Sequence, residues 1–294
     1  MKKLKLLACG AAIAAMIACV SGCTFTIGGK TSYSYKNSDD YVVGDREISD
    51  KVDSIDVDYI SGEVKIVTAD TDVITIKETA KKTLTDKTKV HTWVDGSTLR
   101  IKYCESNKNI NLSNLDKKLE ITIPKDLKLD NLKFDMASGD VDVTCEAKEV
   151  DMDTASGEIK LNLTGDSEKI KIGSASGNVK IDAKNIENFS VSTASGDVVL
   201  NADSVKEFDS DTASGSCECH FKNVPEKIDM DSASGDAKVY LPKDADATVD
   251  FDTASGDFSC DQSYEKKDDK YVLGKGTNKI VMNSASGDLK IVEE

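Results

Sequence analysis

Three Asp-x-Asp pairs recur in consecutive repeats in the last third of the sequence and are the clearest candidates for chemistry. Carboxylates stacked about 5 Å apart repel one another unless they are hydrated, protonated or bridged by a cation. Ca²⁺ prefers oxygen ligands of this kind. The pairs predict a weak calcium site, with a solvated face that binds no metal as the alternative, and indicate no other cofactor. The six residues are Asp209, Asp211, Asp229, Asp231, Asp250 and Asp252.

No catalytic constellation accompanies these carboxylates. The region that holds them contains no arginine and a single histidine, His220. Its aspartates are too alike to split into a general acid and a general base with separate pKa values. No serine lies at the centre of a Gly-x-Ser-x-Gly motif. We therefore expect no catalytic residue and no enzymatic activity.

The acidic pairs belong to a repeat that must position them. The tetrapeptide Ala-Ser-Gly-Asp, or a close variant, recurs eight times, mostly at intervals of 18–21 residues, and the last interval is 31 residues. The glycine supplies a corner with positive φ, which a β-carbon would resist. The pattern also fits once earlier in the chain. The predicted turn glycines are Gly62, Gly139, Gly157, Gly177, Gly196, Gly215, Gly235, Gly256 and Gly287.

Apolar and polar residues alternate strictly on both sides of each glycine, and this period of two predicts β-strands. One repeat of about 19–20 residues is too short to bury its own apolar face, so the repeats must stack. We predict an all-β fold, a right-handed single-stranded parallel β-helix, that is, a β-solenoid with one repeat per coil. A β-sandwich built from hairpins is the alternative.

The region before the regular repeats departs from the period. It contains an Asp-Gly dipeptide, Asp95-Gly96, between two alternating runs, which predicts a hairpin. An open solenoid end exposes core and strand edges, so we assign this region as a cap. The predicted domains are a first coil with an N-terminal β cap over 51–131, and β-helix repeats over 132–294 with a charged insertion near 263–279.

The first 22 residues are typical of an export signal. Three lysines precede an uncharged stretch, Leu6–Gly22, which falls short of the roughly 20 strongly apolar residues of a membrane-spanning helix. The tetrapeptide Val-Ser-Gly-Cys that ends at Cys23 resembles a bacterial lipobox, which implies that Cys23 carries the lipid. We predict a lipoprotein signal peptide over 1–22, a lipid-anchored flexible tether over 23–50, and an extracytoplasmic location on the bacterial cell membrane.

The charge of the chain argues against nucleic acid as a partner. The full sequence has 38 Lys and Arg against 53 Asp and Glu. Removal of the signal peptide with its three lysines leaves 35 basic and 53 acidic residues, a net charge of −18. Such a body repels phosphate backbones. We expect a monomer whose solvated acidic face keeps it soluble.

Several features together resemble the bacterial putative-adhesin β-strand-repeat family, a domain of unknown function. They are the lipobox, the segments Ser61–Ile66 and Ile121–Pro124, the successive Ala-Ser-Gly-Asp turns, and a final Ser286–Asp288 near the end of the chain. The resemblance covers roughly residues 50–294. It implies a β-helical domain at the cell surface or in the envelope, and it brings no catalytic residues.

These observations predict a lipid-anchored, extracytoplasmic, adhesin-like protein that binds or scaffolds without catalysis. Its expected partners are the membrane, through the lipid on Cys23, and a cell-surface polymer, a glycan or an envelope protein. An envelope accessory or stress-response protein that binds another membrane protein is the first alternative. A polysaccharide-active β-helix enzyme is the second, because β-helices host such enzymes, and only this analogy of fold supports it.

Overall fold

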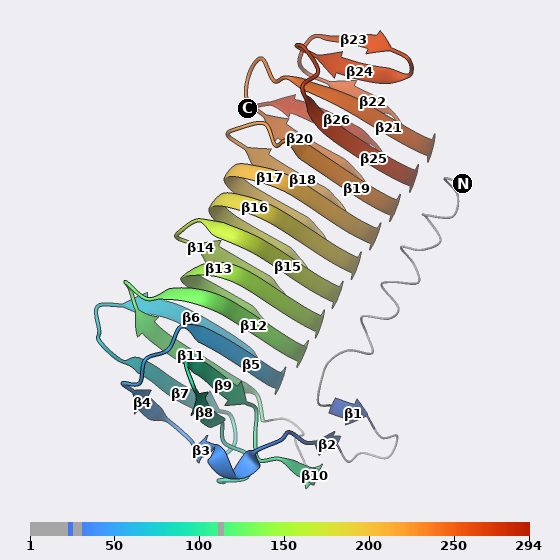
Figure 1. Cartoon of the computed structure of the whole chain (residues 1–294). Helices are drawn as coiled ribbons and strands as arrows, with labels where there is room; N and C mark the ends of the chain where they lie inside the picture. Colours follow the sequence, from blue (N-terminus) through green and yellow to red (C-terminus); the bar gives the residue numbers. More distant parts are fainter. Residues whose placement is uncertain (1–22, 26–30, 111–114) are drawn as a thin grey trace. The chain divides into compact units, whose positions relative to one another are not determined.

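The computed structural model describes the backbone of residues 23–25, 31–110 and 115–294 and the side chains of 33–106 and 115–294 (Figure 1). Over these residues the protein is all-β, as predicted, with one short 3-10 helix, η1 (Ser38–Asp40). The chain divides into two units: an N-terminal unit that ends at Ile159, and a C-terminal unit, Lys160–Glu294.

The strands of the N-terminal unit are β1 (Cys23–Phe25), β2 (Thr31–Tyr33), β3 (Val42–Val43), β4 (Arg46–Ile48), β5 (Ser54–Ser61), β6 (Glu63–Ala69), β7 (Ile74–Ala80), β8 (His91–Asp95), β9 (Thr98–Lys102), β10 (Asn107–Ile110), β11 (Lys117–Pro124), β12 (Lys128–Ser138) and β13 (Val141–Ser156). The strands of the C-terminal unit are β14 (Ile159–Leu163, which begins one residue before the boundary), β15 (Ser167–Ser176), β16 (Val179–Ser195), β17 (Val198–Ser214), β18 (Cys217–Phe221), β19 (Lys227–Ser234), β20 (Ala237–Leu241), β21 (Ala247–Ser255), β22 (Phe258–Cys260), β23 (Tyr264–Lys267), β24 (Lys270–Leu273), β25 (Asn278–Ser286) and β26 (Leu289–Glu293).

Within each unit, successive repeats stack as parallel strands in register. In the C-terminal unit β16 pairs with β17 from Val179↔Val198 to Ser195↔Ser214, so every residue faces its equivalent one repeat later. The N-terminal unit follows the same rule, because β12 pairs with both β5 and β13 in parallel. Figure 1 shows the parallel strands of each unit stacked in this way. Because equivalent residues pair, the apolar residue of one repeat lies beside the apolar residue of the next.

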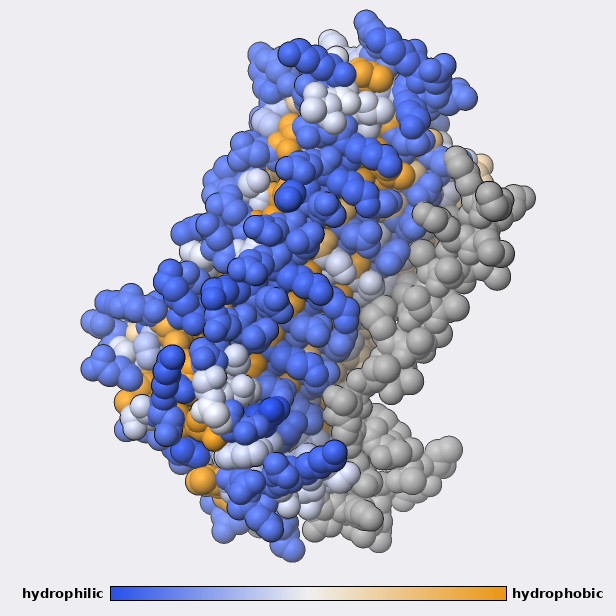
Figure 2. Space-filling model, in the orientation of Figure 1, coloured by the Kyte–Doolittle hydropathy of each residue, from blue (hydrophilic) through white to orange (hydrophobic). Residues whose placement is uncertain are grey.

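The inward columns form a dry core. One column of the C-terminal unit is fully buried in five repeats, and hydrophilic residues predominate on the face of the molecule shown in Figure 2. Burial of an aliphatic side chain contributes roughly 1.5–3 kcal/mol, so stacking stabilises repeats that could not fold alone. The residues of this column are Ile181, Leu200, Cys219, Val239 and Ile291.

The last repeats of the C-terminal unit do not stack in sequence order. β25 lies between β19 and β21, pairing with both in parallel, and β26 likewise lies between β20 and β22. The chain therefore forms its outermost repeat around Gly256, makes the antiparallel hairpin β23–β24, and returns to fill the gap with the repeat of Gly287. The prediction that consecutive repeats are consecutive in space is wrong here.

The turn glycines form a column in which each backbone passes against the next. At Gly196 φ is 145°, and a Cβ built there would lie 2.2 Å from the carbonyl oxygen of Gly177. The same approach, at 1.8–2.2 Å, recurs at Gly139, Gly157, Gly215, Gly235, Gly256 and Gly287. Close stacking of the corners is thus a second reason, besides positive φ, why these positions hold glycine.

The residue after several of the turn glycines supports the corner with its side chain. The Asp197 carboxylate accepts a hydrogen bond from the backbone N–H of Ser216 at 2.9 Å, and its own N–H donates to Oδ1 of Asn178 at 3.0 Å. Similar bonds join Asp236 to Asp288 and Asp288 to Asp257 in the same unit. The side chains that follow the turn glycines therefore form a ladder of hydrogen bonds that links the corners of adjacent repeats.

We expect Asp197→Ala to lower the free energy of unfolding by about 1 kcal/mol, since it removes one hydrogen bond to an exposed backbone N–H. Asp197→Asn should keep most of the stability, because Asn178 makes the equivalent bond with its amide oxygen. Urea unfolding followed by circular dichroism measures both variants. Equal losses in the two variants would contradict the ladder.

The cap is a hairpin with further strands packed on it. β8 and β9 pair in antiparallel fashion around Gly96, which has φ 64°, so the predicted Asp-Gly hairpin is confirmed. β9 also pairs in parallel with β5 of the first repeat, and β11 pairs with β6 in the same way. These strands add one further repeat outside the first one and cover its edge.

The predicted tether over 23–50 is wrong from Tyr33 onward. β3 pairs with β8, and β4 pairs with β7. Tyr33 is fully buried, and its hydroxyl donates to the carbonyl oxygen of Asp58 at 3.1 Å. Aromatic residues in this segment thus anchor it to the cap. A flexible tether would bury nothing.

A buried ion pair lies inside the cap. Lys117 occupies the position of the turn glycine in the outer repeat, and its ammonium is 2.6 Å from Oε1 of Glu78, with side-chain exposures of 0% and 1%. The ammonium also donates to the carbonyl oxygens of Thr88, at 2.8 Å, and of Tyr103, and lies 3.9 Å from the centre of the Tyr103 ring. Burial lowers the pKa of Lys117, and the attraction of Glu78 opposes this shift.

The predicted signal peptide, residues 1–22, lies outside the described residues, as does the side chain of Cys23, whose backbone opens β1. Lipidation at Cys23 therefore stays a prediction. In the part of the chain that is described, no helix has the length and apolar character needed to cross a bilayer.

Candidate ligand-binding site

The cap carries an open pocket of about 220 Å³ in the N-terminal unit. The β8–β9 hairpin forms its floor. Trp93 faces Arg100 across the two strands, and Asp95 and Lys102 follow two residues further along each strand. Because side chains alternate across a strand, these four lie on one face of the hairpin. Leu99 and Ile101, which alternate with them in β9, turn to the core and are fully buried.

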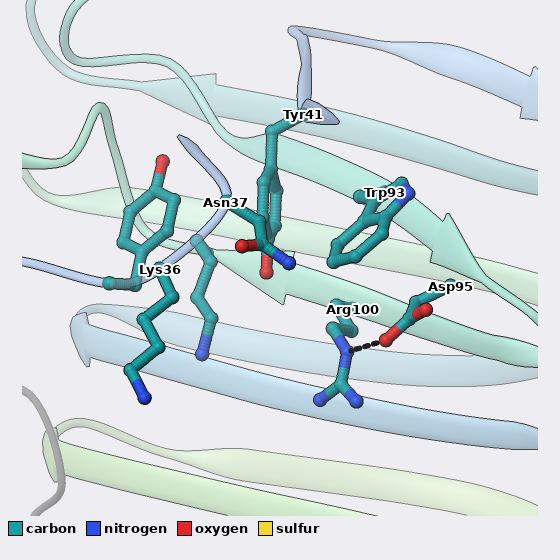
Figure 3. Close-up of a pocket in the computed structure, with 8 residues that line it drawn as sticks. Lys36, Asn37, Tyr41, Trp93, Asp95 and Arg100 are labelled. Carbon is teal, nitrogen blue, oxygen red and sulfur yellow. Dashed lines mark hydrogen bonds and ion pairs between the residues drawn. The ribbon is translucent and has the colours of Figure 1, made fainter. Parts of the chain in front are cut away.

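The pocket wall comes from the segment that precedes β3. The rings of Tyr35 and Tyr41 are 4.9 Å apart and inclined at 57°, and Tyr41 is 5.6 Å from Trp93 at 59°. Tyr35 is fixed by a hydrogen bond from its hydroxyl to the carbonyl oxygen of Cys104, at 3.0 Å. Figure 3 shows Tyr41, Asn37 and Trp93 around one space, with the ion pair of Arg100 and Asp95 beside it.

Two residues at the rim complete the pocket. Asn37 has φ 58°, a conformation that asparagine tolerates, and it starts η1 without a capping bond from its side chain. Its carboxamide is therefore available to a ligand. Lys36 is exposed, and in Figure 3 its side chain extends away from Trp93.

The cations of the pocket floor are compensated by carboxylates. Arg100 lies 3.0 Å from Asp95 through Nε and 2.8 Å from Asp56 through Nη1. Lys102 lies 3.0 Å from Asp58, and this pair is nearly buried. The parallel register of β5 and β9 places Asp56 beside Arg100 and Asp58 beside Lys102. The aspartates thus hold the basic groups in place and neutralise them.

Burial shifts the pKa values of two groups at the pocket, Tyr41 and Asp58. Burial raises the pKa of Tyr41 to about 12, and the nearby Arg100 opposes the shift. Burial also raises the pKa of Asp58, and the ion pair with Lys102 opposes it. The Tyr41 phenol is therefore neutral at physiological pH and can both donate and accept a hydrogen bond.

This shift predicts a loss of stability in alkali. A phenol whose pKa rises from 10 to about 12 on folding stabilises the fold fully below pH 10, and the contribution disappears as the pH rises through 12. Burial raises the pKa of Tyr103 to about 12 as well, so the difference in tyrosinate absorbance between the wild-type protein and Tyr41→Phe should show the loss of one of the phenols that ionise near pH 12. A Tyr41 that ionises near pH 10 would show that water reaches the ring.

The predicted calcium residues are only partly brought together. Asp209 and Asp211 face Asp229 and Asp231 in adjacent repeats. The third pair, Asp250 and Asp252, is separated from them, because β25 lies between and offers Val281 and Asn283 at the equivalent positions. The three-repeat stack is therefore wrong, and its physical cause is the return of the last repeat into the gap.

The remaining carboxylates repel one another. Burial raises the pKa of Asp209, and the charges of Asp211 and Asp229 raise it further. Asn283 donates a hydrogen bond to Asp231 at 2.7 Å. Over the described residues, no three His, Cys, Asp or Glu side chains form a group that could hold a metal ion. Calcium binding stays a prediction, to be tested by the melting temperature with and without calcium.

The chain is similar to one known protein family and to several solved structures. A family model described as Toastrack DUF4097 matches residues 52–292. No curated protein matches. The chain is similar to the crystal structure of a putative adhesin from Bacteroides fragilis (15% identity, 85% of this chain and 97% of that chain, TM-score 0.46) and to that of a putative cell adhesion protein from Clostridium sporogenes (13%, 86% and 100%, TM-score 0.30).

A third solved structure, named as a putative lipid binding protein from Parabacteroides distasonis, has 17% identity over 85% of this chain and 96% of that chain, with a TM-score of 0.39. The family match is the stronger finding, because it extends from just before β5 to the end of β26 and includes every turn glycine predicted from the sequence. The chain belongs to the Toastrack DUF4097 family.

Proposed function

We propose that the protein is a lipid-anchored, extracytoplasmic, adhesin-like binding protein that holds a cell-surface glycan or polymer in the cap pocket. The observation that carries this proposal is the convergence of Tyr35, Tyr41 and Trp93 on one open pocket with polar groups at its floor and rim. Ligand sites combine aromatic walls with a few polar groups in this way.

The repeats serve as the scaffold of this site. We infer that they wind as a right-handed single-stranded β-helix, because parallel crossovers are almost always right-handed. The lipobox that ends at Cys23 supports attachment to the outer face of the cell membrane. A lipid at Cys23 would connect to the cap first, since Tyr33 is only ten residues further along the chain.

The described chemistry supports binding without catalysis. His91 contacts the carbonyl oxygen of Lys89 at 2.9 Å, and His220 contacts Glu218 at 3.0 Å, so each histidine has a partner outside the pocket. The carboxylates under the pocket are engaged with Arg100 and Lys102. An acid and a base would need two groups with well-separated pKa values facing a substrate.

Trp93→Ala should reduce binding to isolated envelope polymers and glycans at least tenfold, because it removes the indole ring from the floor of the pocket. The matched control is Tyr264→Ala, which removes an exposed aromatic ring of the C-terminal unit, 44% exposed, and should leave binding unchanged. Pull-down with the purified protein measures both variants. Retention of a single envelope protein by both variants, with no polymer bound, would favour the accessory-protein alternative.

A further inference from the structure

Building on the proposed function, we propose that the pocket takes one uncharged pyranose unit of a glycan, with Asp95 and Arg100 as the residues that read its hydroxyls. The size of the pocket is the first argument. Sites for drug-sized ligands occupy roughly 300–1,000 Å³. A pocket of about 220 Å³ suits a single ring with its substituents at the open side, where the rest of a polymer can continue.

The shape and polarity of the walls match such a ring. A pyranose presents C–H groups on its faces and hydroxyls around its edge. The inclined rings of Tyr41 and Trp93 offer apolar surface to the C–H groups. The neutral phenol of Tyr41 and the carboxamide of Asn37 lie at the edge, where hydroxyls need partners that both donate and accept.

The charge balance selects an uncharged ligand. Arg100 has two carboxylates within 3.0 Å, and Lys102 has one at 3.0 Å, so three carboxylates face two cations and the floor keeps no positive charge to attract an anion. When Lys36 of the lining is counted, three cations face three carboxylates, so a cation gains no net attraction either. Lys36 is the remaining cation of the lining, and it extends away from Trp93 (Figure 3).

The Arg100–Asp95 pair keeps unused hydrogen-bonding capacity. A guanidinium has five N–H donors, and the two ion pairs of Arg100 engage one on Nε and one on Nη1. Asp95 is bound through Oδ2, which leaves Oδ1 as an acceptor. A donor and an acceptor fixed side by side suit two neighbouring hydroxyls of a sugar ring.

The test titrates the purified protein with three sets of oligosaccharides of equal length and follows Trp93 fluorescence and ligand NMR. The sets are neutral oligosaccharides (glucose, mannose, galactose and N-acetylglucosamine types), acidic oligogalacturonates and cationic chitosan fragments. We expect quenching by at least one neutral oligosaccharide, with at least tenfold weaker binding of the charged sets. Tyr264→Ala should bind as the wild type does.

Asp95→Asn supplies a sharper test, because it leaves Arg100 with one carboxylate instead of two. We expect the ratio of acidic to neutral affinity to rise about tenfold in this variant. Asn37→Ala, which touches no ion pair, should weaken neutral sugars several-fold without changing that ratio. Circular dichroism of each variant checks that the cap is intact.

The outcomes separate the two proposals. Tight binding of oligogalacturonate or chitosan by the wild-type protein, lost in Trp93→Ala, would overturn the uncharged-sugar inference and leave the proposed function standing. An unchanged affinity ratio in a folded Asp95→Asn would also overturn the inference. Binding of glycans that Trp93→Ala does not weaken, or no binding of any set, would overturn the pocket as the site of the proposed function as well.

Discussion

Replacing Lys117 by methionine is expected to lower the free energy of unfolding by about 3–5 kcal/mol. The substitution keeps the volume and removes the charge that compensates Glu78, whose side chain is 1% exposed. The two Glu78 oxygens would keep only neutral donors, the Tyr59 hydroxyl at 2.8 Å and the Val90 N–H at 2.7 Å. Urea unfolding followed by the fluorescence of Trp93, the single tryptophan of the chain, reports on this unit.

The adjacent residue provides a matched control. Lys118 lies in the same strand and makes an ion pair of the same length, 2.6 Å, with Glu63, but both side chains are largely in water, with exposures of 68% and 43%. Exposed pairs contribute little. Lys118→Met should therefore leave the urea midpoint nearly unchanged, and a similar loss in the two variants would show that burial is not the cause.

A double variant separates the charge from the packing. Lys117→Met combined with Glu78→Gln removes both charges and keeps an acceptor for the Tyr59 hydroxyl. Replacing a buried ion pair by uncharged groups is often nearly neutral. The double variant should regain most of the stability lost in Lys117→Met. Failure to regain it would assign the loss to the contacts of Lys117 with Thr88 and Tyr103 instead.

The core of the repeats was predictable, because the apolar residues that alternate in the sequence are the same residues that pack inside the structure. Ile181 and Leu200 alternate with polar neighbours in the sequence, and in the structure they face one another in the dry column. The order in which the last repeats stack was not predictable, because any repeat can pair in register with any other. The one sign of this order in the sequence is the last interval between turn glycines, which is 31 residues long. A chain that leaves a gap for one repeat and then returns to fill it needs a longer connection than a chain that stacks repeats in sequence.

The binding pocket was half visible in the sequence. The hairpin around Gly96 was predicted, and its register alone places Trp93 opposite Arg100 on the outer face. The tyrosines of the wall are not predicted from the sequence, because residues 23–50 have weak apolar periodicity, which is typical of a flexible tether. The alternation of Tyr33 and Tyr35 was the available signal: the first is buried, and the second turns to the pocket.

Gly196→Ala is expected to be strongly damaging for a substitution that adds a single methyl group to the repeats. Its Cβ would lie 2.2 Å from the oxygen and 2.7 Å from the carbon of the Gly177 carbonyl, and both atoms belong to backbone held in a parallel ladder. Strain at φ 145° costs about 1–3 kcal/mol, and overpacking costs about as much again. We therefore expect a loss of roughly 3–5 kcal/mol, measured by urea unfolding with circular dichroism.

Gly96→Ala distinguishes the two causes, because Gly96 has φ 64° but nothing within 4 Å of its added Cβ. An alanine there pays only for the left-handed conformation, about 1–2 kcal/mol. If positive φ alone explained the repeated glycine, Gly196→Ala would cost no more than the strain at φ 145°, about 1–3 kcal/mol, and its loss would lie close to that of Gly96→Ala. A clearly larger loss at Gly196 would show instead that glycine is needed because the corners of adjacent repeats touch. The same contact explains why Gly256 and Gly287 are also glycine, although neither has a φ between +20° and +160°.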